Sequence, residues 1–253
     1  MERLTSRSNP FLQGLERLAK NTSERNEQGL YLCEGEKLLM EALAAGVEVT
    51  AAVWDEELTP QGVYPSIPKQ VVVPHSLYER VSTLKNVRSV LFCCRIPQET
   101  GYVPRRGQVL CLDCVQDPGN VGTVLRTADA FGMDAVYLLG ACADVYNPKT
   151  VRATMGSLFR VPVIRTEAQR FLEDMKNAQI PVYAAALTEN AKPLQDFDYT
   201  RAAVVIGNEG AGVSQELLEK SDYQVIIPMR GQTESLNAAV AASVFMWEMS
   251  RCP

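Results

Sequence analysis

A stretch near the middle of the chain has the composition of a ligand-binding loop. "CVQDPGNVGTVLRTADAFG", residues 114–132, places Gly119, Asn120 and Gly122 where a strand would turn into a helix, and Arg126 follows on that helix. Bare glycine backbone can approach a ligand closely, and a helix N-terminus attracts anions. The stretch lacks the third glycine of a dinucleotide loop, and the chain has no Gly-Lys-Ser or Gly-Lys-Thr sequence. The pattern therefore favours a ligand other than a diphosphate.

Two later stretches share this combination of bare backbone and isolated polar side chains. "VVIGNEGAGVS", residues 204–214, surrounds Asn208 and Glu209 with glycines, and "VIIPMRGQTESLNAAVAA", residues 225–242, reaches Ser235 at a helix start. Each stretch has an ordinary explanation when taken alone, because Asn and Ser often cap helices and glycines often make turns. The recurrence of the pattern in three places favours one shared site.

The elements expected around these loops alternate between strand and helix. The predicted strands are 108–115, 134–140, 181–187, 202–208 and 223–228, and the predicted helices are 121–131, 149–158, 170–178, 215–220 and 235–249. Such alternation indicates a mostly parallel sheet with helices on both faces. Ligands of such sheets bind beyond the carboxyl ends of the strands, where the three loops would lie.

The first part of the chain reads as a separate, small α/β domain, residues 1–96. Apolar spacing predicts helices at 9–20, 34–46 and 75–84 and strands at 47–54 and 70–74. Residues 97–106 are rich in Pro, Gly and charge without periodicity, so we expect a linker there. The second domain would then occupy residues 107–253.

Composition limits the possible functions. With 253 residues, 46% of them apolar, the chain can bury a substantial core. It has no stretch of membrane-spanning length and no signal-peptide pattern, so we expect a cytoplasmic protein without a membrane partner. The net charge of −5 neither indicates nor excludes nucleic acid, because a local basic patch would suffice.

Cysteine and histidine provide no evident chemistry. The seven cysteines are irregularly spaced, and Cys111 and Cys114 of "CLDC" are interpreted as strand residues. The only histidine, His75, is expected in a turn or at a helix start. We therefore predict no metal site and no histidine dyad or triad.

The three loops together resemble the SpoU/TrmH class of the SPOUT superfamily, which are RNA ribose 2'-O-methyltransferases that use S-adenosylmethionine (AdoMet). The matching residues are Asn120, Gly122, Arg126, Thr127 and Ala128, then Gly207 to Gly212, then Ile227, Pro228, Met229, Ser235, Leu236 and Asn237. "VRATMGSLFRVPV" looks like a further family segment, with Thr154 where Ser is usual. The resemblance spans about residues 107–251.

The resemblance implies an α/β fold whose second domain is a knotted SPOUT methyltransferase domain with a deep trefoil knot. The first domain is similar to the small RNA substrate-binding domain that precedes it in many such enzymes. In this reading AdoMet is the cofactor. It is held by backbone of the knotted loops and by apolar contact, at Gly207, Ile227, Met229, Leu236 and Asn237.

The resemblance also implies the catalytic residues Arg126, Asn120, Glu209, Ser235 and Asn237. We expect Arg126 to hold the RNA phosphate and the 2'-oxygen, because a guanidinium stays protonated in proteins. The alternative role proposed for this arginine is general base. No metal takes part in either reading.

The expected partners are a structured RNA, with ribosomal RNA favoured over transfer RNA, and a second copy of the chain. The helix 235–249 could supply part of a homodimer surface, or its apolar residues Leu236, Val240, Val244 and Trp247 could face the core. The other functions considered are a tRNA 2'-O-methyltransferase, a catalytically silent RNA-binding module of the same fold, and, last, a small-molecule methyltransferase.

Overall fold

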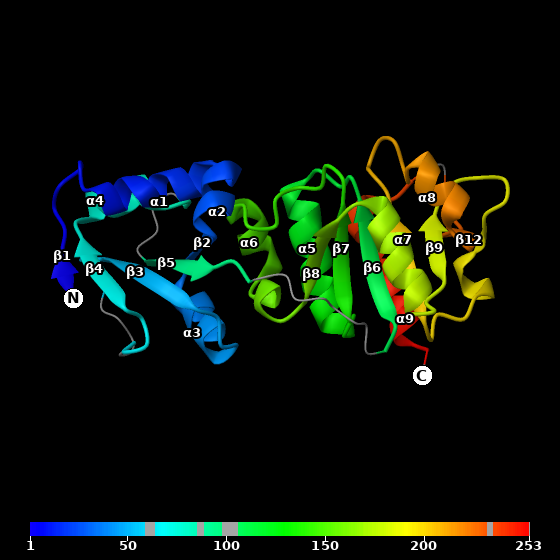
Figure 1. Ribbon diagram of the computed structural model, residues 1–253, viewed down its shortest axis with the longest axis horizontal. Coiled ribbons are helices and arrows are strands. Elements are labelled where there is room, and N and C mark those ends of the chain that lie inside the picture. The colour runs from blue at the N-terminus through cyan, green and yellow to red at the C-terminus, as the bar shows by residue number, and fades with distance from the viewer. Residues whose placement is uncertain (59–63, 85–88, 98–105, 232–234, 253) are drawn as a thin grey trace. The chain divides into compact units, whose positions relative to one another are not determined.

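Two units, each with its own sheet, make up the fold (Figure 1). The computed structural model describes residues 1–58, 64–84, 89–97, 106–231 and 235–252. Unit 1 comprises Met1–Gln98 and Asp144–Phe159, and unit 2 comprises Glu99–Ala143 and Arg160–Pro253. The expected linker, residues 97–106, falls almost entirely on 98–105, outside the described residues.

The described part of unit 1 contains a mixed five-stranded sheet, in the order β1-β4-β3-β5-β2. Its strands are β1 (Glu2–Arg3), β2 (Leu30–Glu34), β3 (Val49–Asp55), β4 (Lys69–Val73) and β5 (Val90–Arg95). β3 and β4 confirm the two strands predicted here, and β5 runs antiparallel to β2 and β3. β2 and β5 were not predicted, because they are buried almost throughout and lack the alternation of a half-exposed strand.

Helices cover both faces of this sheet. They are α1 (Pro10–Lys20), α2 (Thr22–Gln28), α3 (Glu36–Ala44) and α4 (His75–Val81). One core lies beneath α1 and α4 and the other beneath α3. Asn9 caps α1, since its side chain accepts a hydrogen bond from the Phe11 N–H. The prediction that His75 starts a helix is confirmed by α4.

Residues 144–159 pack into unit 1, although the expected division places them in the second domain. They contain α6 (Pro148–Thr154) and the short 3-10 helix η1 (Ser157–Phe159), which replace the continuous helix predicted there. The break occurs at Met155, whose φ of 50° is left-handed. Val151 joins the core beneath α3, and the buried Arg25 forms an ion pair with Asp144. Sequence periodicity carries no information about such long-range packing.

Unit 2 is built on a parallel sheet, which in the described residues has seven strands in the order β10-β12-β9-β11-β6-β7-β8 (Figure 1). They are β6 (Gln108–Asp113), β7 (Ala135–Leu139), β8 (Val163–Thr166), β9 (Val182–Ala185), β10 (Lys192–Pro193), β11 (Ala202–Ile206) and β12 (Tyr223–Ile226). All pairings between these strands are parallel, which confirms the predicted sheet type. The sequence did not indicate β8 and β10, which are short and lie at the sheet edges.

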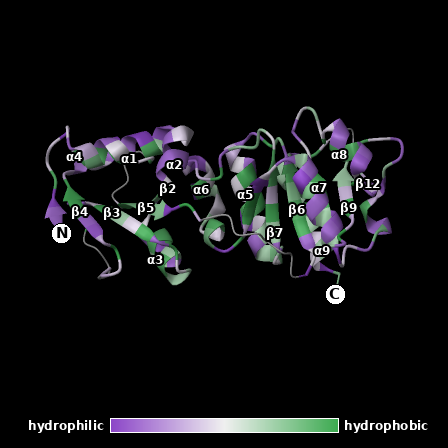
Figure 2. Cartoon of the chain, viewed as in Figure 1, coloured by the Kyte–Doolittle hydropathy of each residue, from purple (hydrophilic) through white to green (hydrophobic). Residues whose placement is uncertain are grey.

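The helices of unit 2 lie on both faces of its sheet. They are α5 (Pro118–Phe131), α7 (Ala168–Asn177), α8 (Gln215–Lys220) and α9 (Ala238–Ser250), with the 3-10 helix η2 at Leu194–Asp196. One set of strand residues packs under α7 and α8, whereas α5 and α9 pack against each other and against β6, β7 and β11. Figure 2 shows the central strands as mainly hydrophobic and α7 as largely hydrophilic, as expected for an outer helix.

The backbone tests the interpretation of Cys111 and Cys114 as strand residues. Cys111 lies within β6 as expected, but Cys114 does not, because the strand ends at Asp113 and Cys114 has a left-handed φ of 56°. None of the described helices is long and apolar enough to cross a membrane.

Candidate active site

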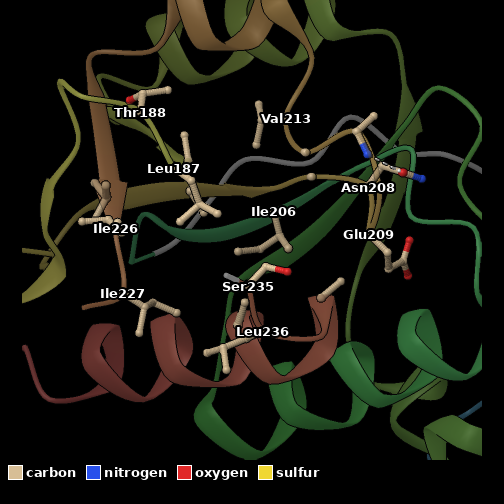
Figure 3. Close-up of a pocket in the computed structure, with 18 of the residues that line it drawn as sticks. Leu187, Thr188, Ile206, Asn208, Glu209, Val213, Ile226, Ile227, Ser235 and Leu236 are labelled. Carbon is tan, nitrogen blue, oxygen red and sulfur yellow. Dashed lines mark hydrogen bonds between the residues drawn. The ribbon is translucent and has the colours of Figure 1, made fainter. Parts of the chain in front are cut away.

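A cavity of about 460 Å³ opens at the carboxyl ends of β9, β11 and β12, against the start of α9 (Figure 3). Its walls come from the ends of these strands, from the loop after β11, from the loop after β12 and from α9. Six of the predicted site residues line it: Gly207, Glu209, Ile227, Met229, Ser235 and Leu236. Figure 3 shows Ile226 and Ile227 at one side of the cavity and Glu209 at the other. The cavity thus has an apolar end and a polar end.

The loop after β11 is folded back tightly on itself. A Cβ atom on Gly207 would lie 2.1 Å from the Gly212 carbonyl carbon and 2.2 Å from the Val213 nitrogen, so only glycine fits there. Asn208 fixes the turn, because its Oδ1 accepts the N–H groups of Gly210 and Ala211 at 2.9 and 3.0 Å. Backbone of this loop is therefore held at the cavity wall.

The loop after β12 reaches the first turn of α9. Asn237 caps this helix, since its Oδ1 accepts hydrogen bonds from Ala239 N at 2.9 Å and Val240 N at 3.3 Å. The ordinary explanation of Ser235 as the cap is therefore wrong, and Ser235 lines the cavity instead. Residues 232–234 lie outside the described residues.

Three side chains from the three loops form one hydrogen-bonded chain. Asn237 donates from Nδ2 to Oδ1 of Asn120 at 3.1 Å, and Asn120 donates from Nδ2 to Oε1 of Glu209 at 2.6 Å. Asn120 is not the cap of α5, because Asp117 accepts the Asn120 N–H and begins that helix. These three side chains are accessible to solvent, since Glu209 and Asn237 are exposed and Asn120 is half-buried.

Among the predicted site residues, Arg126 alone neither belongs to this network nor lines the cavity. It lies exposed on α5, it does not line the cavity, and within the described part of the chain no hydrogen bond or ion pair engages its guanidinium. The structure therefore joins Asn120, Glu209 and Asn237 directly and leaves Arg126 as an open cation on the same helix as Asn120.

Several lining residues were missed by the sequence analysis. Leu187 and Thr188 follow β9 and border the cavity, and Thr188 donates to Oε1 of Gln224 at 2.6 Å. Their position at the end of the predicted strand 181–187 and directly after it was a usable signal, because ligands of parallel sheets bind at the carboxyl ends of strands.

The buried thiols of Cys111 and Cys142 are not built as nucleophiles. Burial raises the pKa of Cys142 to about 11, and burial also raises the pKa of Cys111 well above its usual range. Among the described residues, no group of three or more His, Cys, Asp or Glu side chains is placed to hold a metal ion. The polar side chains that line the cavity are the Asn208 amide, the Thr188 and Ser235 hydroxyls and the Glu209 carboxylate.

An apolar stripe runs along the outer face of α9. Leu236, Val240 and Trp247 are 37%, 49% and 55% exposed, so the interpretation that they face the core is wrong for these three. Val244, the fourth residue of that interpretation, is half-buried. Trp247 makes an edge contact with Phe131 of α5. The stripe therefore belongs to a surface formed by α5 and α9, with hydrophobic side chains left open to solvent.

Comparison with known proteins places the chain in a family. The model of the SpoU rRNA Methylase family matches residues 107–247, which is more than half of the 253 residues. The chain belongs to the SpoU rRNA methylase family. Residues 9–91 match the MRM3-like substrate binding domain.

Two relatives named as 23S rRNA methyltransferases align with this chain over nearly their whole length. The chain is 36% identical over 251 residues to the 23S rRNA (guanosine(2553)-2'-O)-methyltransferase RlmP of Bacillus subtilis, with 98% of this chain and 99% of the relative covered. It is 31% identical over 264 residues to the 23S rRNA (uridine(2479)-2'-O)-methyltransferase of Streptomyces viridochromogenes, with 98% and 92% covered.

Solved structures of the family have the same fold. An AdoMet-bound rRNA methyltransferase from Sinorhizobium meliloti superposes with a TM-score of 0.87 at 28% identity, covering 99% of this chain and 97% of that one. A TrmH/SpoU tRNA modifying enzyme of A. aeolicus covers only 59% of this chain and 77% of its own, with a TM-score of 0.52 at 30% identity. The likeness to the first structure therefore includes both units, each taken by itself.

Proposed function

We propose that this protein transfers a methyl group from AdoMet to a ribose 2'-oxygen of ribosomal RNA. The observation that carries the proposal is the hydrogen-bonded network of Asn237, Asn120 and Glu209, of which Glu209 lines the cavity. Relatives named as 23S rRNA 2'-O-methyltransferases share almost the whole chain, whereas the tRNA modifying enzyme shares little more than half. Ribosomal RNA is therefore favoured over transfer RNA. The intact polar residues favour an enzyme over a silent RNA-binding module.

The cavity fits the proposed cofactor in size and chemistry. Its volume of about 460 Å³ is in the range of small-molecule sites, and its Ile227 and Leu236 end can accept an adenosine. Because Gly207 has no side chain, backbone atoms form the cavity wall at this position, and their N–H and C=O groups can contact the edge of a base. When bound, AdoMet supplies an electrophilic methyl group on a sulfonium.

Arg126 is proposed to position the RNA and not to accept a proton. Its guanidinium is exposed and free of partners in the described residues, as a phosphate-binding group must be before substrate arrives. Methyl transfer from a sulfonium releases a neutral thioether, so the reaction needs no general acid. We expect Arg126→Lys to lower the rate without moving the pH–rate profile. A profile that shifts with the ionisation of the lysine would favour the general-base role instead.

A homodimer is proposed to bury the apolar stripe of α9. Val240 and Trp247 are the most exposed of its large side chains, and a second copy of the same face would cover them. Sedimentation of Trp247→Glu should give a monomer where the unchanged protein gives a dimer. Met40→Glu, at a similarly exposed methionine of α3, is the matched control and should leave the dimer intact. We also propose that unit 2 contains the deep trefoil knot of the family and that the protein is cytoplasmic. Both proposals are supported by the family resemblance.

The decisive experiment measures AdoMet binding by calorimetry and then tritium transfer to ribosomal and transfer RNA. We expect about one site per chain, loss of binding in Leu236→Arg, and transfer to ribosomal RNA only. Met40→Arg is the control for adding an arginine away from the cavity, and it should bind AdoMet normally. A folded protein that binds no AdoMet would overturn the proposal. Binding with transfer to transfer RNA alone would refute the substrate assignment.

A further inference from the structure

Asp113, the last residue of β6, has a carboxylate that the proposed reaction does not use. The residue is only 4% exposed, and Oδ2 accepts a hydrogen bond from the Ser214 N–H at 2.7 Å. A buried carboxylate is costly unless hydrogen bonds stabilise it, and bonds to a charged acceptor are the stronger kind. Asp113 therefore forms a strong link between two segments that are 101 residues apart in the sequence.

Ser214 is the residue at which α8 begins, and its own side chain makes no capping hydrogen bond. In a capping box, a carboxylate three residues into the helix binds the N–H of the cap residue. Asp113 binds the same N–H from a neighbouring strand. The start of α8 is thus held by a carboxylate at the end of β6, and not by a capping side chain of the helix itself.

The loop between Gly207 and Val213 is held at both ends by two consecutive residues, Asp113 at the end of β6 and Cys114 directly after it. At its beginning, Asn208 donates from Nδ2 to the Cys114 carbonyl oxygen at 2.9 Å, and just after its end Ser214 donates to Asp113. Residues 207–213 line the cavity, so the distance between these two anchors sets where one wall lies. Glu209 sits in the same loop, so the anchors also place its carboxylate beside Asn120.

We infer that Asp113 is a positioning residue that holds the glycine loop against the AdoMet cavity through the Ser214 N–H. The inference rests on the proposed function for its cofactor and deepens it. Asp113 does not line the cavity, so it acts only through the loop. Loss of its hydrogen bond should allow the loop to move and lower the affinity for AdoMet about 10- to 100-fold, as expected for a bond to a charged group.

Two pairs of variants separate this role from a general loss of packing. Asp113→Ala removes the acceptor, whereas Asp113→Asn keeps an oxygen that can accept the same bond and should restore most of the affinity. Ser214→Pro removes the donor N–H, and the φ of −59° at this position suits proline. Ser214→Ala keeps the N–H and is the matched control. The double variant Asp113→Ala with Ser214→Pro should bind AdoMet no more weakly than either single variant.

The experiment measures the Kd for AdoMet and amide hydrogen exchange of the protein without cofactor. Asp113→Ala and Ser214→Pro should weaken binding and raise exchange in residues 208–214 more than in β6 or β11. In turnover, they should raise the KM for AdoMet more than they lower kcat, whereas partial unfolding would lower kcat at unchanged KM. Unchanged exchange in both variants, or equal loss in Ser214→Ala, would overturn the inference. Failure of the unchanged protein to bind AdoMet would refute the proposed function alone, because the exchange measurement still tests the loop.

Discussion

Replacing Gly207 by alanine gives the sharpest test of the cavity wall. The new Cβ would lie 2.1 Å from the Gly212 carbonyl carbon, and ordinary contact begins at 3.4 Å, so the two segments must separate by about 1.3 Å (3.4 − 2.1). The atoms it meets are backbone atoms of Gly212 and Val213, which cannot rotate away as a side chain could. Overpacking of this kind costs about 1–3 kcal/mol. The displaced residues are those that line the cavity, so we expect AdoMet affinity to fall by about 10- to 100-fold.

Calorimetric titration with AdoMet measures this loss, and thermal unfolding reports the stability of the same sample. Gly231→Ala is the matched control, because its Cβ would meet nothing within 4 Å, its φ is not left-handed and Gly231 does not line the cavity. The Kd of this control variant for AdoMet should therefore lie within about twofold of that of the unchanged protein. Equal binding by Gly207→Ala and Gly231→Ala would refute the idea that the tight backbone approach at Gly207 shapes the cofactor cavity.

Three other changes have defined outcomes. Asn120→Asp sets a second carboxylate against Glu209, where the present contact is 2.6 Å, and should lower kcat/KM about 10- to 100-fold in a tritium-transfer assay. Arg25→Ala leaves Asp144 without its buried partner and should lower the free energy of unfolding by about 3–5 kcal/mol in urea titration. The hydrogen bond to Asp55 raises the pKa of His75, so its stabilisation should be complete below about pH 6.5 and fade as pH rises through the raised pKa; His75→Gln should flatten that dependence.

The sequence predicted those parts of the fold that have a local signal. Helix α1 was evident because Leu12, Leu15 and Leu18 recur at helical spacing and Asn9 precedes Pro10. The strands of unit 2 were evident from their alternation with helices. By contrast, the packing of residues 144–159 into unit 1 depends on contacts such as Arg25 with Asp144, 119 residues apart, and no local pattern encodes it.

The candidate site was predictable to a similar degree. The glycine, amide and charged residues identified the three loops as candidates. The rule that ligands bind at the carboxyl ends of parallel strands then predicted that the loops lie close together. What could not be predicted was the direction of each side chain. Leu236 and Trp247 were as compatible with the core as with the surface, and only the packing of α9 against α5 and the sheet left them exposed.

The capping of α9 determines which groups donate and which accept in the hydrogen bonds that link Asn237, Asn120 and Glu209. Asn237 has a single side-chain oxygen, and that oxygen accepts the Ala239 and Val240 N–H groups, so its amide nitrogen must point away from the helix. This nitrogen donates to Oδ1 of Asn120, which leaves the Asn120 amide nitrogen to donate to Glu209. The orientation of two amides is thereby set by the start of one helix. An aspartate in place of Asn237 would still cap α9 but could not donate, and Asn120 would lose the contact that orients it towards Glu209. Asn237 therefore serves the helix and the site with opposite ends of one amide.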